Sequence, residues 1–436
     1  MTTPIFDFVK SYNDGKTVRF HMPGHKGVSS LGCEGYDITE ISGADVLYSA
    51  DGIIEESENN LSALYGTEHS FYSTQGSTLA IFAMLYLVSN HTEGRPLILA
   101  ARNVHSAFVR AAALIDIDVE WLYPERQDHL CSCKVTASEL EKSLSGMEKM
   151  PRAVYVTSPD YLGNMLDIAS LAEVCRKHGV PLLVDNAHGA YLKFLENDCH
   201  PITLGTAMCA DSAHKTLPVL TGGAYLHISK GYPEYAKKAR GALSLFASTS
   251  PSYLTLSSLD LCNARLGSDY PAKIKDTAEK IAEAKKKIES LGFAVCDSEP
   301  LKIVIKSGSS FSEHLRREGI ECEFSDSEYT VLMLTPENSD SDLDKLLSAI
   351  ESADREVKPL SSKSPKPHER VMNIREAIFA DSESIKVESA LGRICASPTV
   401  SCPPAVPIVI SGERITNEDI ELFKHYGIEF VDVVVE

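Results

Sequence analysis

The feature that most constrains the fold is the alternation of two kinds of segment between about residues 60 and 230. Short runs of apolar and β-branched residues are separated by longer segments whose apolar residues recur with the helical period. The runs occupy residues 96–101, 119–124, 153–158, 181–185 and 223–229. Strands that alternate with helices pair mainly in parallel and are covered by those helices. The sequence therefore predicts an α/β fold with a mainly parallel sheet, which binds ligands at the carboxyl ends of its strands.

Two helices of this region have recognisable ends. One is predicted over 77–88 after a Gly-Ser-Thr start, and the other over 168–178, where Gly179 suits the C-terminal cap. The apolar stretch 79–88 is about half as long as the roughly 20 residues that a membrane span needs. The N-terminus carries acidic residues and has no long apolar targeting segment. We therefore expect a cytoplasmic protein without a membrane anchor.

The composition changes after the strand-rich region. A helix rich in Lys, Glu and Ala is predicted over 270–292, and strands and helices alternate from there to residue 351. A segment rich in Lys, Ser and Pro then has the character of an exposed linker. We predict an N-terminal arm, a large cofactor-binding domain, a small α/β domain, a linker and a C-terminal α+β module, over residues 1–40, 41–265, 266–354, 355–369 and 370–436.

Charge and cysteine content exclude several classes of protein. The chain has 42 Lys and Arg against 61 Asp and Glu, a net charge of −19, so a nucleic acid or an anionic membrane surface is not an expected partner. The 11 cysteines include one C-x-C and no C-x-x-C, which indicates neither a zinc knuckle nor a disulfide framework. We expect reduced thiols and no metal. One basic, glycine-bearing run, residues 21–27 (HMPGHKG), differs from this acidic background.

Lys215 and Asp185 are the first candidate catalytic residues. Lys215 lies between a predicted short strand and the Gly222-Gly223 turn, where a lysine can form a Schiff base if partial burial lowers its pKa. Asp185 ends a predicted strand 30 residues earlier, and a carboxylate there can hold the pyridine nitrogen of pyridoxal phosphate protonated. The alternatives are an ordinary surface lysine and an aspartate that caps a helix.

Two further segments precede or follow predicted strands. The run 75–78 (QGST) opens an apolar helix, whose free backbone N–H groups suit a phosphate, although helix capping alone also explains such a start. His105 follows the strand at 96–101 and could stack on a cofactor ring. Its alternative is a loop histidine bonded to the backbone.

Five ordered runs of the sequence resemble one enzyme family. The runs HMPGHKG, TQGSTLAIFAML, RNVH, DNAHGAY and SAHKTLPVLTGGAYLH are similar to segments of the bacterial ornithine/lysine/arginine decarboxylases, which have the aspartate aminotransferase fold (fold type I). The resemblance spans most of residues 20–260. Residues 248–253 (STSPSY), 259–260 (LD) and 388–393 (ESALGR), and the later pair Pro403-Pro404, resemble further segments of the family.

The resemblance implies pyridoxal 5′-phosphate as cofactor. It implies that Lys215 forms the Schiff base, that Asp185 pairs with the pyridine nitrogen and that His105 stacks on the ring. The other implied cofactor-binding residues hold the phosphate or lie near the ring; they are Gly76, Ser77, Thr78, His188, Ser212 and His214.

The family also implies homodimers with active sites at the subunit interface, and it leaves open a higher assembly of these dimers. The HMPGHKG run would then line the site, with His25 and Lys26 as candidate substrate or interface contacts. Glu413 would meet the distal amino group of the substrate, and the alternative is a surface acid in a turn.

This chain departs from the family pattern at several positions. The family's C-terminal module usually reads PPGIP…PGE, whereas here Ala405 stands for the glycine and Ser411 for the later proline. Ser106 replaces a lysine of larger members, and Gly222 or Gly223 replaces a common glutamine. We expect a short form of the family, without the N-terminal wing domain of the large inducible enzymes.

These observations predict a pyridoxal-phosphate-dependent decarboxylase that converts arginine, lysine or ornithine into an amine and CO₂, a reaction of polyamine metabolism. Lys215, His25 and Cys402 are the candidates for the proton donor to the α-carbon. Cofactor residues alone do not decide which bond breaks, so an aminotransferase or another lyase stays open, as does a catalytically silent regulatory relative. The arginines that could bind a substrate carboxylate in an aminotransferase are Arg316, Arg370, Arg375, Arg393 and Arg414.

Overall fold

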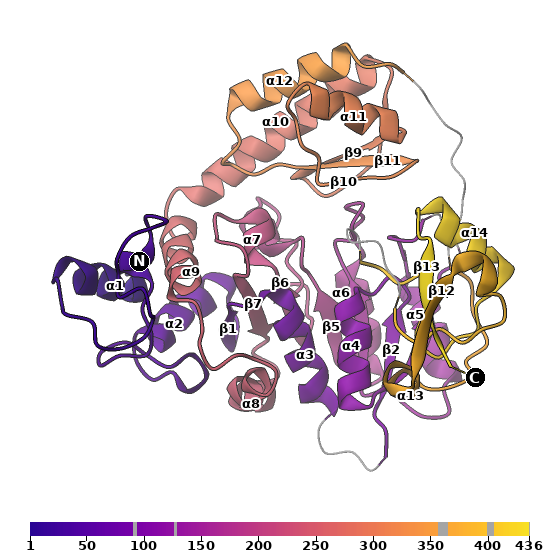
Figure 1. Ribbon diagram of the computed structural model, residues 1–436, viewed down its shortest axis with the longest axis horizontal. Helices are drawn as coiled ribbons and strands as arrows, with labels where there is room; N and C mark the ends of the chain where they lie inside the picture. Colours follow the sequence, from indigo (N-terminus) through magenta and orange to yellow (C-terminus); the bar gives the residue numbers. More distant parts are fainter. Residues whose placement is uncertain (90–93, 126–128, 356–364, 399–404, 436) are drawn as a thin grey trace. The chain divides into compact units, whose positions relative to one another are not determined.

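The computed structural model describes residues 1–89, 94–125, 129–355, 365–398 and 405–435 (Figure 1). Most of the predicted linker lies outside the described residues, as do Cys402, Pro403 and Pro404.

Seven strands form one sheet in the order β1-β7-β6-β5-β4-β2-β3 (Figure 1). Their bounds are β1 His69–Ser73, β2 Leu97–Ala101, β3 Asp118–Leu122, β4 Ala153–Thr157, β5 Leu182–Asp185, β6 Met208–Asp211 and β7 Ala224–Ile228. Strand β2 is parallel to β3 and β4, and β5 is parallel to β6, whereas β7 is antiparallel to β1 and β6. The predicted α/β fold with a mainly parallel sheet is confirmed, and β1 is a strand that the alternation did not single out.

The helices of this part of the chain include both predicted ones. Their bounds are α1 Pro4–Asp14, α2 Ile53–Tyr65, α3 Gly76–Ser89, α4 Ser106–Ile115, α5 Ala137–Gly146, α6 Ile168–Lys177, α7 Ala213–Thr216, α8 Pro233–Ser244 and α9 Tyr253–Leu266. Gly179 follows the last residues of α6 with φ of 68°, and the Val180 N–H donates to the Cys175 carbonyl at 2.9 Å. The glycine therefore ends α6 in the left-handed conformation that few other residues adopt.

Two smaller sheets follow. Strands β8 Ala294–Val295, β9 Lys302–Lys306, β10 Phe324–Ser325 and β11 Tyr329–Met333 pair in the order β10-β11-β9-β8, with helices α10 Tyr270–Ser290, α11 Ser309–Arg317 and α12 Asp340–Glu351. Strands β12 Ser382–Lys386 and β13 Phe430–Val434 form an antiparallel pair, with helices α13 Ile374–Phe379 and α14 Asn417–His425. The predicted elements of the small α/β region are present, and the two-residue strands β8 and β10 are additional.

The chain folds into two compact units, each assembled from distant segments. The first unit comprises Met1–Val88 and Leu183–Lys275, and the second comprises Ser89–Leu182 and Asp276–Glu436. This division does not follow the order of the chain, so the predicted series of domains stays a prediction. In the part of the chain that the structure describes, no helix is both long enough and apolar enough to cross a membrane.

One buried acid in the first unit secures the N-terminal helix. The first N–H groups of a helix have no partner inside it, and the N-cap residue Thr3 makes no side-chain cap. Asp260 of α9 accepts from the Ile5 and Phe6 N–H groups at 2.9 and 3.0 Å, and from the Ser57 hydroxyl at 2.5 Å. Burial raises the pKa of Asp260 to about 6, although these donors oppose the rise.

We predict that Asp260 makes the chain more stable as the pH falls from 7 to 4. Asp260 binds a proton with a pKa of about 6 in the folded state, against 3.8 in the unfolded state. Protonation of Asp260 therefore adds its full contribution to the free energy of unfolding below about pH 4, and this contribution is lost above about pH 6. Relative to Asp260→Asn, which carries no proton to titrate, the wild type should gain up to about 3 kcal/mol over this range. Urea denaturation of both proteins at several pH values measures the difference, and parallel profiles would contradict the prediction.

Candidate active site

Asp185 is a buried carboxylate at the carboxyl end of β5 in the first unit. Its side chain accepts a hydrogen bond from the Ala187 N–H at 3.2 Å, and the residue is 2% exposed. The next helical segment is the short 3₁₀ turn Ala190–Phe194, whose N-cap is Gly189. The alternative that Asp185 caps a helix is therefore wrong, and the carboxylate is left at the edge of the sheet where parallel α/β folds bind ligands.

Lys215 lies on the short helix α7, directly after β6, and not in the loop that the sequence suggested. Its Nζ lies 3.1 Å from Nε2 of His188, in the turn after β5. His188 is buried and Lys215 is half-buried, so the surface-lysine alternative is also wrong. The amine and an imidazole are thus adjacent at the ends of two neighbouring strands.

His214, between Ser212 and Lys215, is fixed by the backbone. Its Nδ1–H donates to the Gly223 carbonyl at 2.9 Å. Burial lowers the pKa of His214, and the positive charge of Lys215 lowers it further, although the carbonyl contact opposes the change. The imidazole is therefore neutral at physiological pH and adds no charge beside Lys215.

Two serine hydroxyls meet at the start of α3. The Ser212 hydroxyl donates to Oγ of Ser77 at 2.7 Å. Helix α3 begins at Gly76, so Ser77 and Thr78 are its second and third residues and neither occupies the N-cap position. Capping therefore does not explain this Ser-Thr pair. The free N–H groups of the first helical turn and the two hydroxyls together can hold an oxyanion.

Glycines shape the backbone around this helix start. Gly76 has φ of 73°, and its N–H donates to the Gly222 carbonyl at 2.8 Å. Gly222 has φ of 94°, and a Cβ on it would lie 2.8 Å from the Thr74 carbonyl oxygen. A larger residue at Gly222 would therefore displace the loop that leads into α3.

His105 belongs to the second unit and is the N-cap residue of α4. Its Nδ1 accepts a hydrogen bond from the Ala107 N–H at 3.1 Å, which fixes the ring. This contact is the backbone bond that the loop-histidine alternative expected. Since the contact uses only Nδ1 at the edge of the ring, it does not test whether the face of His105 stacks on a cofactor, and stacking stays a prediction.

Glu413, also in the second unit, is buried and is not the surface acid of the alternative. Its Oε2 accepts from the Ile410 N–H at 2.9 Å and lies 3.8 Å from Arg102 and 3.5 Å from His368. Arg102 is fully buried and donates to the carbonyls of Pro407 and Ile408 at 2.9 and 2.8 Å. Sequence reasoning missed this arginine, although it stands first in the RNVH run.

His25 and Lys26 lie on the N-terminal arm in the first unit. His25 contacts the Asp37 carboxylate at 3.2 Å, and Lys26 donates to the His21 carbonyl at 2.5 Å with a φ of 53°. These contacts are local, and none joins the arm residues to Lys215 or Asp185 in the described part of the chain.

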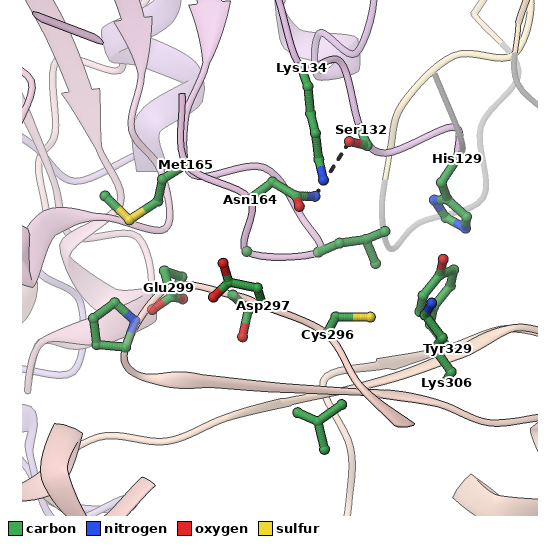
Figure 2. Close-up of a pocket in the computed structure, with 15 residues that line it drawn as sticks. His129, Ser132, Lys134, Asn164, Met165, Cys296, Asp297, Glu299, Lys306 and Tyr329 are labelled. Atoms are coloured by element: carbon green, nitrogen blue, oxygen red, sulfur yellow. Dashed lines mark hydrogen bonds between the residues drawn. The ribbon is translucent and has the colours of Figure 1, made fainter. Parts of the chain in front are cut away.

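A pocket of about 680 Å³ lies in the second unit. In Figure 2, Lys134 and His129 face Cys296 and Tyr329 across it. The Glu299 N–H donates to the Gly163 carbonyl at 2.8 Å, which connects the lining segments 162–165 and 295–300. None of the predicted site residues lines the pocket. The lining residues are His129, Ser132, Lys134, Leu162, Gly163, Asn164, Met165, Val295, Cys296, Asp297, Ser298, Glu299, Pro300, Lys306 and Tyr329.

Comparison with protein families identifies the enzyme class. Residues 3–309 match the model of the Orn/Lys/Arg decarboxylase major domain, and residues 357–428 match that of the C-terminal domain. The chain belongs to the ornithine/lysine/arginine decarboxylase family. It is therefore an amino-acid decarboxylase, as the five sequence runs predicted.

Individual relatives agree with this family. An arginine decarboxylase of Bacillus subtilis is 27% identical over 468 residues, which cover 97% of this chain and 93% of that protein. The structure of the constitutive lysine decarboxylase of E. coli has a TM-score of 0.80 at 17% identity and covers 100% of this chain and 82% of that chain. A structure of SPT with PLP has a TM-score of 0.55 at 14% identity and covers 68% and 75% of the two chains. The structural matches show the fold that these decarboxylases share with other fold type I enzymes.

We predict that Arg102→Leu destabilises this family member strongly. The change leaves Glu413 buried without its arginine and leaves two carbonyls without their donor, which costs about 3–5 kcal/mol for a broken buried pair. Chemical denaturation measures the loss. Arg316→Ala removes an exposed arginine that pairs with Glu321, and it should stay close to wild type. Equal stability of the two variants would contradict the role of Arg102.

Proposed function

We propose that the enzyme decarboxylates a basic L-amino acid, arginine, lysine or ornithine, with pyridoxal 5′-phosphate as cofactor. The observation that carries this proposal is the grouping of Lys215, Asp185, Ser77 and Ser212 at the ends of β5 and β6 and the start of α3, all within the first unit. An amine, a buried carboxylate and an oxyanion site are the three groups that this cofactor requires of a protein.

The residues of the first unit fit this cofactor. The hydroxyls of Ser77 and Ser212, 2.7 Å apart, and the N–H groups of Ser77 and Thr78 suit a dianionic phosphate at the positive end of the α3 dipole. The neutral His214 adds a ring nitrogen without a charge. When bound, pyridoxal phosphate withdraws electrons from the substrate α-carbon, so that the carboxylate can leave as CO₂.

Asp185 and Lys215 then have distinct tasks. The buried Asp185 carboxylate keeps a proton on the pyridine nitrogen, because the ion pair is shielded from water. The Lys215 Nζ binds the cofactor covalently and is also the first candidate to return a proton to the α-carbon. His188, 3.1 Å from that nitrogen, orients it and can accept or donate its proton. The other proton-donor candidates are His25 and Cys402, and Cys402 lies outside the described residues.

A carboxylate is the expected partner of a cationic substrate side chain, and Glu413 is our candidate. A carboxylate has about four acceptor positions, so the contacts of Glu413 with Ile410, Arg102 and His368 do not exhaust it. The names of the relatives, arginine decarboxylase and lysine decarboxylase, support a basic substrate. His105 would stack on the cofactor ring, as the family resemblance implies.

The arginines that an aminotransferase would need are already engaged. Each of the five candidates bonds to an acid or to backbone carbonyls within the second unit, namely Arg316 to Glu321, Arg370 to Asp118, Arg375 to the Ala113 and Leu114 carbonyls, Arg393 to Glu383 and Arg414 to Glu369. Exposed pairs such as Arg316 with Glu321 are weak, so the support for decarboxylation over transamination comes from the family match.

A cytoplasmic location is part of the proposal. All ten cysteines of the described residues are free, which suits a reducing compartment. The net charge of −19 suits a protein that acts on small cationic molecules and not on nucleic acid.

The decisive experiment offers arginine, lysine and ornithine to the purified enzyme and measures CO₂ and the amine product. We expect one of the three to be converted, together with a visible absorbance band from the bound cofactor. Lys215→Ala should abolish both the band and turnover, and Asp185→Asn should bind cofactor but lose about 100-fold or more in rate. Keto acid without CO₂ would refute decarboxylation, and full activity of Lys215→Ala would refute the assignment of the catalytic lysine.

We also propose that the enzyme is a homodimer that uses its N-terminal arm as an interface. The arm exposes a series of large apolar side chains, a pattern typical of a covered surface. Phe20 is 95% exposed and Leu31 is 87% exposed. The other members are Val18, Met22 and Val28. His25 and Lys26 lie within this segment, so a partner subunit that covers it would bring them close to a second chain.

We predict that the double variant Phe20→Ser, Leu31→Ser dissociates into monomers. The change removes about 300 Å² or more of apolar area from the arm, since large apolar side chains bury 150–250 Å² each. Sedimentation at micromolar concentration gives the mass. Leu114→Ser changes a side chain of α4, 50% exposed, outside the arm, and should sediment as the wild type does. A double variant with unchanged mass would exclude the arm as the interface.

A further inference from the structure

A group of fully buried polar side chains lies behind the ends of β5 and β6. Its centre is Asp211, the last residue of β6. One carboxylate oxygen accepts from Nδ2 of Asn186 at 2.7 Å, and the other lies 2.8 Å from Nε2 of His200 and 3.4 Å from Nε2 of His227. None of these side chains is used by the proposed chemistry. Since a buried carboxylate is costly without partners, this arrangement requires an explanation.

The proton positions show that Asp211 acts as an acceptor. Nδ1 of His200 accepts from the Ile202 N–H at 3.4 Å, so the hydrogen of this ring lies on Nε2 and points to Asp211. On the other side, His227 is fixed by a 2.8 Å contact of its Nδ1 with the Ser70 hydroxyl. Burial alone would raise the pKa of Asp211, but the two histidines hold it well below its usual range. Asp211 is therefore ionised at neutral pH.

Asp211 and Asn186 are direct neighbours of the proposed cofactor residues. Asn186 follows Asp185, and Asp211 precedes Ser212 and the helix that carries Lys215. The β5–β6 ladder ends with the pair Asp185 and Ala210, and the Asn186 N–H still donates to the Ala210 carbonyl at 3.0 Å. The Asn186–Asp211 side-chain bond continues the pairing one residue beyond the ladder.

The turn after β5 packs closely around Asn186. A Cβ on Gly189 would lie 2.1 Å from Oδ1 of Asn186, so only glycine fits there. The Asn186 side chain therefore has a fixed position, with Asp211 on one side and the Asp185–His188 turn on the other. A shift of this side chain would move the turn.

We propose that Asp211 and Asn186 are positioning residues, which hold the Asp185–His188 turn and the α7 helix at a fixed separation. His200 and His227 keep both oxygens of Asp211 available as acceptors. The Asp185 carboxylate and the Lys215 amine, which lie on the two segments so joined, keep the distance that one bound cofactor needs. This inference rests on the proposed function of both residues.

A metal site is the competing explanation. The donor atoms of His200, Cys209 and Asp211 lie within 4.8 Å of one another. However, Nε2 of His200 lies 2.8 Å from Asp211, at hydrogen-bond distance, and three side chains are fewer than the four ligands of a structural zinc site. This geometry favours a hydrogen-bonded network.

The test uses Asp211→Asn and Asn186→Ala, with Cys209→Ala as a matched control. In Asp211→Asn, the new amide N–H group faces one of the groups that donate to Asp211, namely Asn186, His200 or His227. Asn186→Ala removes the Asn186–Asp211 hydrogen bond but not the contacts of Asp211 with the two histidines. Cys209→Ala removes a thiol that donates to the same Asp211 oxygen at 3.6 Å, so it takes away one contact of Asp211 but neither of the two linked side chains. Three quantities are measured: the dissociation constant of pyridoxal phosphate from titration of the apoenzyme, the pH midpoint of the absorbance change of the bound cofactor, and the melting temperature.

We expect both test variants to bind pyridoxal phosphate about 10-fold or more weakly and to shift the absorbance midpoint by about one pH unit, because Asp185 and Lys215 change their geometry. Cys209→Ala should lower only the melting temperature. If the test variants behave like Cys209→Ala, the positioning role is wrong. One equivalent of zinc per chain would also overturn it. A wild type that fails to bind the cofactor would instead contradict the proposed function.

Discussion

The parallel pairing of β5 with β6 is the constraint on which the candidate site depends. The two strands end side by side, so the residues that follow them emerge at one edge of the sheet. One strand ends in Asp185 and the other leads into the helix of Lys215, which is why Lys215 approaches His188, three residues after Asp185. Ser212 then meets Ser77 of α3 because the same short helix begins beside β6. The position of Ser77 depends in addition on β1, which leads into α3 and pairs with β7, the neighbour of β6.

The sequence singled out the residues to which we assign chemistry, but not the residues that hold them in place. Strand ends and a helix start are local patterns, so Asp185, Lys215 and Ser77 could be singled out from the alternation and the family runs. The short helix α7 could not, because four residues are too few for a helical period. Asp211 and Arg102 were also missed. The partners described above lie from 11 to more than 300 positions away, and no local pattern indicates such contacts.

Buried acids give part of the net charge a structural role. Glu34 accepts from the N–H groups of residues 30 to 33, and these bonds lower its pKa to about 2. Asp45 accepts from the N–H groups of Gly52 and Ile54 at the start of α2. Asp260 serves α1 in the same way. The charge of −19 therefore cannot be attributed to solubility alone, since several of its carboxylates replace the missing hydrogen-bond partners of loops and helix starts.

The second unit links the cofactor-stacking candidate to the substrate candidate. The Ser106 N–H, next to His105, donates to the Ala405 carbonyl at 2.8 Å, and Arg102 binds the next carbonyls along that segment. Ala405 has a φ of 56°, in the region that favours the glycine found there in the family pattern. The contacts of Arg102 and Ser106 offset the cost of this conformation. Arg102 also lies beside Glu413. One arginine therefore holds the segment whose Ala405 carbonyl bonds next to His105, and it also holds the carboxylate that we propose as the substrate contact.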